Sequence, residues 1–285
     1  MINPKSLLMP LSTSGHVPER IKGALSVAKF FNAHLEVLHA QVSPSQFLPR
    51  EVVGMPDSIL QQLESVAGSY SKTESQKLQA LFESLCAELG VNVSDDASSN
   101  LPNAHWQEVN GLRSELVAER GKVADMIIIP QSKSGKPSST FEAAIMRSGK
   151  PVLLVPRVMT EFKVNKTIIA WNGSTEVARA VTHALPLLKK ADEVVLATSY
   201  TASVIKPGLD EVQAYLEIHG VKASTTDFDS SHGPTGRAIL DLAHEKQSDL
   251  IVMGAFTHRR VHEQIFGGVT QYMMGHSDLP ILMMH

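Results

Sequence analysis

Short runs of consecutive apolar residues alternate along the chain with stretches in which apolar residues recur every three or four positions. The first run is Leu7–Leu11, and its continuous apolar character is typical of a strand buried on both faces of a parallel sheet. A helix is predicted next, because Pro18 suits a first helical turn and because one face of the stretch is apolar through Ile21, Ala24, Leu25 and Ala28. The run Leu35–His39 is predicted as the second strand.

The second half of the chain shows the same alternation. Ser174 or Thr175 is predicted to cap a helix whose apolar face consists of Val177, Val181, Ala184, Leu185 and Leu188. Glu193–Ala197 is predicted as the strand that follows. Further helices are indicated in the first half by Leu78, Leu81, Phe82, Leu85 and Leu89, and in the second half by Ile239, Leu242 and Ala243.

Three of the predicted strands occur twice, which indicates an internal repeat. Lys5–Leu11 recurs at Lys166–Asn172, Asp125–Ile129 at Asp249–Met253, and Pro151–Val155 at Pro280–Met284. Each copy reads roughly βαβαβαβαβ, which predicts two tandem doubly wound parallel-sheet domains of the α/β class. The predicted domains are residues 1–157 and 164–285.

The first copy is longer because it carries extra residues around 41–75. A short helix containing Met55, Ile59, Leu60 and Leu63 is predicted there, covering apolar surface.

A candidate anion site follows the fourth strand of the second copy. Ligands of doubly wound sheets bind beyond the carboxyl ends of the strands. Gly254, which lacks a Cβ, allows the backbone to approach a ligand closely or to adopt a positive φ. Gly267 and Gly268 open a helix, whose free N–H groups favour an anion, and the hydroxyl of Thr270 can add a donor. We favour this interpretation over the alternative that the two glycines only allow the helix to pack closely on the sheet.

These segments carry a family resemblance. Ile168–Ser174, Leu250–Ala255 and Phe266–Thr270 resemble the universal stress protein family, and the whole chain resembles its tandem two-domain form. Nucleotide-binding members have a loop of the form Gly-x2-Gly-x9-Gly-(Ser/Thr). The family implies an adenine nucleotide alpha hydrolase-like fold and a non-enzymatic stress-response protein that binds an adenine nucleotide, ATP. The resemblance implies a nucleotide site formed by Ala170, Asn172, Met253, Gly254, Thr257, Gly267, Gly268, Val269 and Thr270.

Two of these residues depart from the pattern. Asn172 stands where nucleotide-binding relatives have an aspartate, so the charge is lost and N–H donors are added. Thr257 stands at a glycine position, where a β-branched residue is unfavourable if the backbone needs a positive φ. The loop therefore has the residues of a phosphate site except at Thr257, where the expected glycine is replaced.

The first copy lacks these features. Leu11 takes the place of Asn172, and Pro130 takes the place of Gly254. Gly135-Lys136 is followed by Pro137 instead of serine or threonine, so it is not a Walker A motif. We therefore predict a degenerate first copy, kept for structure or for binding an unknown protein partner, and one nucleotide site per chain, in the second copy.

Composition narrows the class of protein. The 285 residues are 43% hydrophobic and carry a formal net charge of −3, which gives no electrostatic reason to expect nucleic acid as a partner. The N-terminus has no signal-like apolar region, and the apolar runs are too short for a membrane span. A single cysteine, Cys86, leaves no intrachain disulfide. These features predict a cytoplasmic protein without a membrane partner.

The sequence contains no recognisable metal-binding or catalytic motif. His258 and His262 are four residues apart, but no third ligand lies at a persuasive spacing and the HExxH motif is absent. No nucleophile with its base is recognisable. The turn His232–Gly236 opens a helix and could line the same cleft as the predicted anion site. Two alternatives to a non-enzymatic nucleotide-binding protein remain. One is an interaction or signalling protein that no longer binds nucleotide, and the other is a slow ATP hydrolase.

Each copy ends in a short strand, Val152–Val155 and Ile281–Met284. An unpaired edge strand invites pairing, and members of the resembled family form dimers through this strand. We predict that the two edges pair antiparallel within one chain as an intramolecular pseudo-dimer. Val152, Leu154, Ile281 and Met283 would then share one buried face. A further homodimer would need a different surface.

Overall fold

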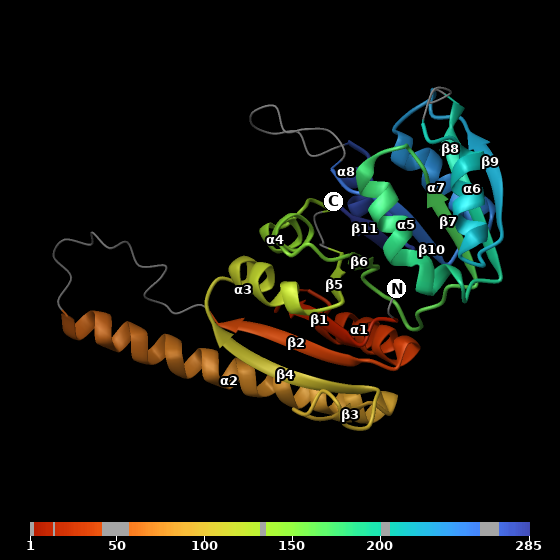
Figure 1. Cartoon of the computed structure of the whole chain (residues 1–285). Helices are drawn as coiled ribbons and strands as arrows, with labels where there is room; N and C mark the ends of the chain where they lie inside the picture. The colour runs from red at the N-terminus through yellow and green to blue at the C-terminus, as the bar shows by residue number, and fades with distance from the viewer. Residues whose placement is uncertain (1–2, 14, 42–56, 132–134, 201–205, 257–267) are drawn as a thin grey trace.

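The computed structural model describes residues 3–13, 15–41, 57–131, 135–200, 206–256 and 268–285, with only the backbone for 57–71. Strands and helices alternate through both halves of the chain (Figure 1). The elements of the first half are β1 (Ser6–Leu11), α1 (Val17–Phe31), β2 (His34–Gln41), α2 (Asp57–Leu89), β3 (Asn92–Val93), β4 (Asn103–Asn110), α3 (Arg113–Arg120), a 3-10 turn (Gly121–Val123), β5 (Met126–Pro130), α4 (Ser139–Arg147) and β6 (Val152–Val155).

The second half has the same order with fewer insertions. Its elements are β7 (Lys166–Ala170), α5 (Thr175–Leu188), β8 (Glu193–Ser199), α6 (Leu209–Ile218), β9 (Ala223–Phe228), α7 (Thr235–Glu245), β10 (Leu250–Gly254), α8 (Gly268–His276) and β11 (Ile281–Met284). Of the two predicted caps of α5, Ser174 is the one used, because its side chain accepts a hydrogen bond from the N–H of Val177.

All the strands join in one sheet with the order β3-β4-β2-β1-β5-β6-β11-β10-β7-β8-β9. Neighbouring strands within each half are parallel, with the order reversing beside β1 and beside β7. The predicted doubly wound α/β fold is therefore confirmed, and each half carries its switch point at the carboxyl end of its first strand.

The centre of the sheet is an antiparallel pair made by the last strand of each half. β6 pairs with β11, with Leu154 opposite Ile281, Leu153 opposite Leu282 and Val152 opposite Met283. The predicted pairing of the two edges within one chain is confirmed. The sheet buries Val152, Leu154, Ile281 and Met283 in one apolar layer and the alternate residues of both strands in the other.

Helices cover both faces of the sheet. The buried residues of α1, α2, α5 and α6 form one apolar layer, and those of α3, α4, α7 and α8 form the other. Equivalent helices of the two halves thus lie on the same face, as expected for two copies related by an approximate two-fold axis.

Repeated hydrogen bonds support the repeat residue by residue. Asp125 Oδ2 accepts from the N–H groups of Lys5 and Ser6 at 2.8 and 2.9 Å, and Asp249 Oδ2 accepts from the N–H of Lys166 at 3.0 Å. An aspartate directly before β5, and another directly before β10, therefore fixes the start of the first strand of its half, at the positions that the sequence repeat pairs.

Two helices that the sequence predicted in the first half form a single helix. The short helix around Ile59–Leu63 and the helix ending at Leu89 were expected to be separate, but α2 continues through 33 residues. Met55 lies outside the described residues. Figure 1 shows α2 running beside β4 and extending beyond the sheet. A further strand, β3, is added at the outer edge beside β4.

Cys86 lies in the part of α2 that packs on the sheet, and its side chain is fully buried. Burial, reinforced by the carboxylate of Glu83, raises the pKa of this thiol to about 12. Because the thiolate is the reactive form, we expect no alkylation of the folded chain by iodoacetamide at about pH 8 and complete alkylation in concentrated guanidinium. Rapid labelling of the native protein would show that α2 detaches from the sheet.

Candidate functional site

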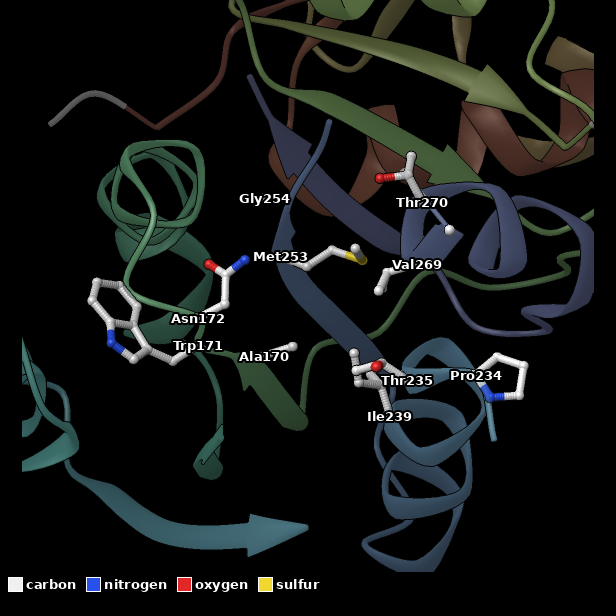
Figure 2. Close-up of a pocket in the computed structure, with 11 residues that line it drawn as sticks. Ala170, Trp171, Asn172, Pro234, Thr235, Ile239, Met253, Gly254, Val269 and Thr270 are labelled. Carbon is white, nitrogen blue, oxygen red and sulfur yellow. The ribbon is translucent and has the colours of Figure 1, made fainter. Parts of the chain in front are cut away.

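A cavity of about 300 Å³ lies beyond the carboxyl ends of β7 and β10, between the starts of α7 and α8 (Figure 2). We call it the strand-end cavity. It is lined by Ala170, Trp171, Asn172, Pro234, Thr235, Ile239, Met253, Gly254, Gly268, Val269 and Thr270. This is the switch point of the second half, where doubly wound sheets bind their ligands.

The structure brings the predicted residues together as far as it describes them. Seven of them, from three separate segments, line the strand-end cavity: Ala170, Asn172, Met253, Gly254, Gly268, Val269 and Thr270. Thr257 and Gly267 lie outside the described residues, as do His258 and His262.

Other lining residues were not assigned to the site from the sequence. Pro234 and Thr235 belong to the turn that could line the cleft, and the structure places them in its wall. Ile239 was interpreted only as part of an apolar helix face, and Trp171 only as part of a repeated strand. Trp171 directly precedes Asn172 at the end of a buried strand, and this position could have indicated that Trp171 lines the site.

Asn172 helps to shape the loop that enters α5. Its Oδ1 accepts a hydrogen bond from the N–H of Ser174 at 3.2 Å, as asparagine commonly does in loops before helices. Its side chain is exposed, and Figure 2 shows the amide close to the end of β10. The side chain thus both fixes the loop and borders the strand-end cavity.

Gly254 is required by packing on α5. A Cβ on this residue would lie 2.8 Å from the backbone N of Val177 and 2.9 Å from Cβ of Glu176. Both atoms belong to the first turn of α5, so a side chain at position 254 has no space. The close approach that the sequence indicated is therefore to a helix, although Gly254 also borders the strand-end cavity.

The start of α8 forms the opposite wall. Thr270 is 3% exposed, and its Oγ1 accepts a hydrogen bond from the N–H of Phe256 at 3.3 Å. Phe256 has a φ of +56°, so the residue directly before Thr257 adopts the left-handed conformation. A Cβ at Gly268 would meet no atom of the described residues within 4 Å. The first N–H groups of a helix lack partners within the helix and favour negative charge.

Trp171 separates the strand-end cavity from a second, more apolar one. Its indole Nε1–H donates to the carbonyl of Pro207 at 2.9 Å, and its side chain is buried. The second cavity, of about 410 Å³, lies between α5 and α6 and is also lined by Trp171. The indole is thus held rigidly at the wall of both cavities.

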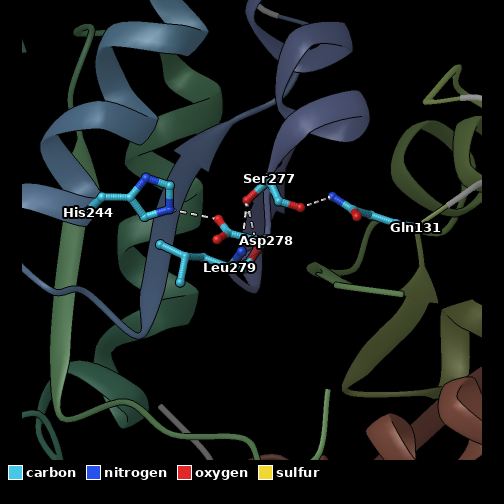
Figure 3. Close-up of polar contacts among 5 residues, drawn as sticks. All are labelled: Gln131, His244, Ser277, Asp278 and Leu279. Atoms are coloured by element: carbon cyan, nitrogen blue, oxygen red, sulfur yellow. Dashed lines mark hydrogen bonds and ion pairs between the residues drawn. The ribbon is translucent and has the colours of Figure 1, made fainter. Parts of the chain in front are cut away.

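The far ends of α7 and α8 are fastened to each other and to the first half (Figure 3). His244 Nε2 lies 2.7 Å from Asp278 Oδ1, which joins the end of α7 to the turn after α8. In the same turn the carbonyl of Ser277 accepts a hydrogen bond from the side-chain amide of Gln131, a residue of the first half. Both helices that border the strand-end cavity are thereby held from their carboxyl ends.

The corresponding region of the first half is occupied by arginines. Arg20 donates to the carbonyl of Ser12 at 3.2 Å, and Arg113 donates to the carbonyl of Leu11 at 3.1 Å. Burial lowers the pKa of both guanidinium groups, and the nearby charges of Arg113 and Arg157 lower that of Arg20 further. The two halves thus present different surfaces at their equivalent strand ends.

Two negative findings concern only the described part of the chain. No helix there is both long and apolar enough to cross a bilayer. Within the same residues, His, Cys, Asp and Glu side chains form no group of three or more that could hold a metal ion.

The fold and the cavity define an α/β protein with a ligand-sized site at the switch point of its second half. Residues 163–285 match the model of the Universal stress protein family. The second half of the chain is therefore similar to the domain of this family. No curated protein was found to match the chain.

Solved structures extend the likeness in fold to nearly the whole chain. A universal stress protein from Archaeoglobus fulgidus DSM 4304 is similar with a TM-score of 0.64 and 16% identity, and the match covers 97% of this chain and 96% of that one. A functionally unknown protein from Pseudomonas aeruginosa PAO1 is similar with a TM-score of 0.52 and 16% identity, covering 98% of this chain and 92% of that one. Both halves together thus share the architecture of solved proteins of the same size.

Proposed function

We propose that this chain is a non-enzymatic, cytoplasmic stress-response protein that binds an adenine nucleotide, ATP, in the strand-end cavity of its second half. The observation that carries the proposal is the convergence of Asn172, Gly254 and Gly268–Thr270 on one cavity at the switch point. We place the two domains at 1–157 and 164–285, and we assign the first a supporting role.

The chemistry of the cavity suits a nucleotide. A nucleobase has apolar faces and polar edges, and the wall combines Ala170, Ile239 and Met253 with the amide of Asn172. At the opposite end the start of α8 offers backbone N–H groups and the hydroxyl of Thr270, as an anion requires. We therefore propose that the nucleoside lies towards Asn172 and the phosphates towards Gly268.

The same wall favours binding over catalysis. No lining residue in the described part of the cavity carries an ionisable side chain, so that lining offers no group for general acid–base catalysis. A bound nucleotide would remain intact and act through the shape it gives the protein. A turnover assay that detects ATP hydrolysis abolished by Gly268→Val would contradict this part of the proposal.

Calorimetric titration of the full chain with ATP, ADP and AMP tests the proposal. We expect one nucleotide per chain and a Kd in the micromolar range, equivalent to about −8 kcal/mol. Trp171 gives a second readout, because only Trp106 and Trp171 are present and Trp106 lies in β4 of the first half. In a Trp106→Phe variant, the remaining emission should change on binding.

Two results would contradict it. Occupancy near Leu11 and Pro130 would place the site in the first half instead. No heat and no change in emission with any of the three nucleotides would favour the alternative, an interaction or signalling protein that does not bind nucleotide. The observation behind that alternative is Asn172, which replaces a charged aspartate and whose Oδ1 accepts the N–H of Ser174.

A further inference from the structure

A third cavity lies where the two halves meet, and we call it the junction cavity. It has a volume of about 550 Å³. Its lining comes from both halves and consists of Gly135, Lys136, Arg157, Pro234, Gly268, Gln271, Tyr272, Gly275 and His276. Pro234 and Gly268 also line the strand-end cavity. The two cavities therefore adjoin at the start of α8.

The first-half wall of the junction cavity is held against α8 by close backbone contact. Gly135 has a φ of +66°, and a Cβ on it would lie 2.6 Å from Cα of Gly275. Only glycine satisfies both conditions at once. The hydrogen bond from Gln131 to the carbonyl of Ser277 fastens the same segment at the end of α8 (Figure 3). Lys136, the next residue after Gly135, thus starts from a backbone position fixed relative to α8.

The charge of the junction cavity is positive on the first-half side. Lys136 and Arg157 line it, and no described lining residue is a carboxylate. The remaining titratable groups on the wall belong to α8, where the ring of His276 stacks on Tyr272 and its Nδ1 contacts the carbonyl of Tyr272 at 2.9 Å. By contrast, the described lining of the strand-end cavity is uncharged. Among the described lining residues of the two cavities, charged side chains therefore lie only beyond the start of α8.

An uncharged cavity adjoining a positively charged one matches the layout of a nucleoside polyphosphate. The nucleoside of such a ligand is neutral, and the first phosphate is bonded directly to its sugar. Each further phosphate lengthens the ligand and adds negative charge. A ligand whose first phosphate lies at the start of α8 has the junction cavity directly beyond it. Lysine suits a flexible approach to phosphate, and arginine can bind two phosphate oxygens at once.

We infer that Lys136 and Arg157, both contributed by the first half, bind the terminal phosphates of a nucleotide whose nucleoside lies in the strand-end cavity of the second half. The inference rests on the proposed function and specifies it. The site would select ATP and ADP over AMP, and the first half would complete the site. Lys136, whose Gly-Lys sequence is no Walker A motif, would still bind phosphate, but across the junction between the halves.

The test compares AMP with ATP on full-length variants. We expect Lys136→Gln with Arg157→Gln to raise the Kd for ATP about tenfold and to leave that for AMP within about twofold. The preference for ATP in the unmodified chain should also shrink as salt is added, because Lys136 is exposed and its charge is screened. Lys136→Arg should keep most of the preference, since it conserves the charge.

Lys122→Gln is the matched control, because this exposed first-half lysine precedes β5 and does not line either cavity. It should leave both Kd values unchanged. Equal weakening of AMP and ATP binding in the double variant, or an unchanged ratio of the two, would overturn the inference while leaving the proposed function in place. No binding of either nucleotide by the unmodified chain would overturn both.

Discussion

Gly268→Val should weaken ATP binding about 30-fold, equivalent to the loss of about 2 kcal/mol of hydrogen bonding to a charged group. Gly268 opens α8 and borders both the strand-end and junction cavities. A branched side chain there would crowd the position of the first phosphate at the helix start. The measurement is calorimetric titration with ATP, supported by the emission of Trp171 in the Trp106→Phe background.

The fold should tolerate this change, which makes the result interpretable. Within the part of the chain that the structure describes, a Cβ at Gly268 meets no atom within 4 Å, so we expect the Tm to stay within about 2 °C of the unmodified value. Gly268→Ala adds the smallest side chain and should weaken binding to an intermediate degree. Unchanged ATP affinity in the valine variant would remove the anion site at the start of α8.

Gly254→Val should instead lower the free energy of unfolding by about 3 kcal/mol, at the upper end of the usual cost of overpacking. Its Cβ would lie 2.8 Å from the backbone N of Val177, and a backbone atom cannot move aside as the end of a flexible side chain can. The first turn of α5 would have to shift away from β10. The measurement is thermal unfolding, in which the Tm should fall by about 10 °C.

The two valine variants serve as controls for each other. Both place the same side chain beside the strand-end cavity, but only one meets backbone. If Gly254→Val unfolded at the same temperature as the unmodified chain and only lost ATP binding, the glycine would serve the ligand and not the packing of α5.

The fold was largely predictable because the sequence repeats itself. Two apolar strands that recur with their flanking aspartate and proline residues define the same unit twice, and they determine the order of strands on each side of the switch point. The pairing of β6 with β11 could also be anticipated, since two edge strands of one chain must otherwise remain exposed. The sequence stopped being informative in α2. The apolar residues around Ile59–Leu63 and around Leu78–Leu89 predicted two separate helices, yet one helix continues through both.

The site was predictable where glycine or a strand end marked it and less so elsewhere. Seven predicted residues line the strand-end cavity because the ends of parallel strands meet at one edge of the sheet. Ile239 was not recognised, since its role in an apolar helix face hides its place in a cavity wall. Lys136 was considered only within a local motif. Its place beside α8 depends on contacts between Gly135 and Gly275, which are far apart in sequence, and local patterns carry no trace of such contacts.

The antiparallel pair β6–β11 has a consequence for how the two halves could diverge. In a symmetric homodimer every substitution occurs on both sides of the axis, so an interface residue must suit both of its roles. Here the partners are one molecule, and their association does not depend on protein concentration. A residue on one side can therefore specialise without altering its counterpart. The first half has arginines at its strand ends, and the second half has an open cavity at the equivalent place. Because the two halves are covalently joined, dilution cannot separate these two surfaces and exchange with other copies cannot combine two identical ones.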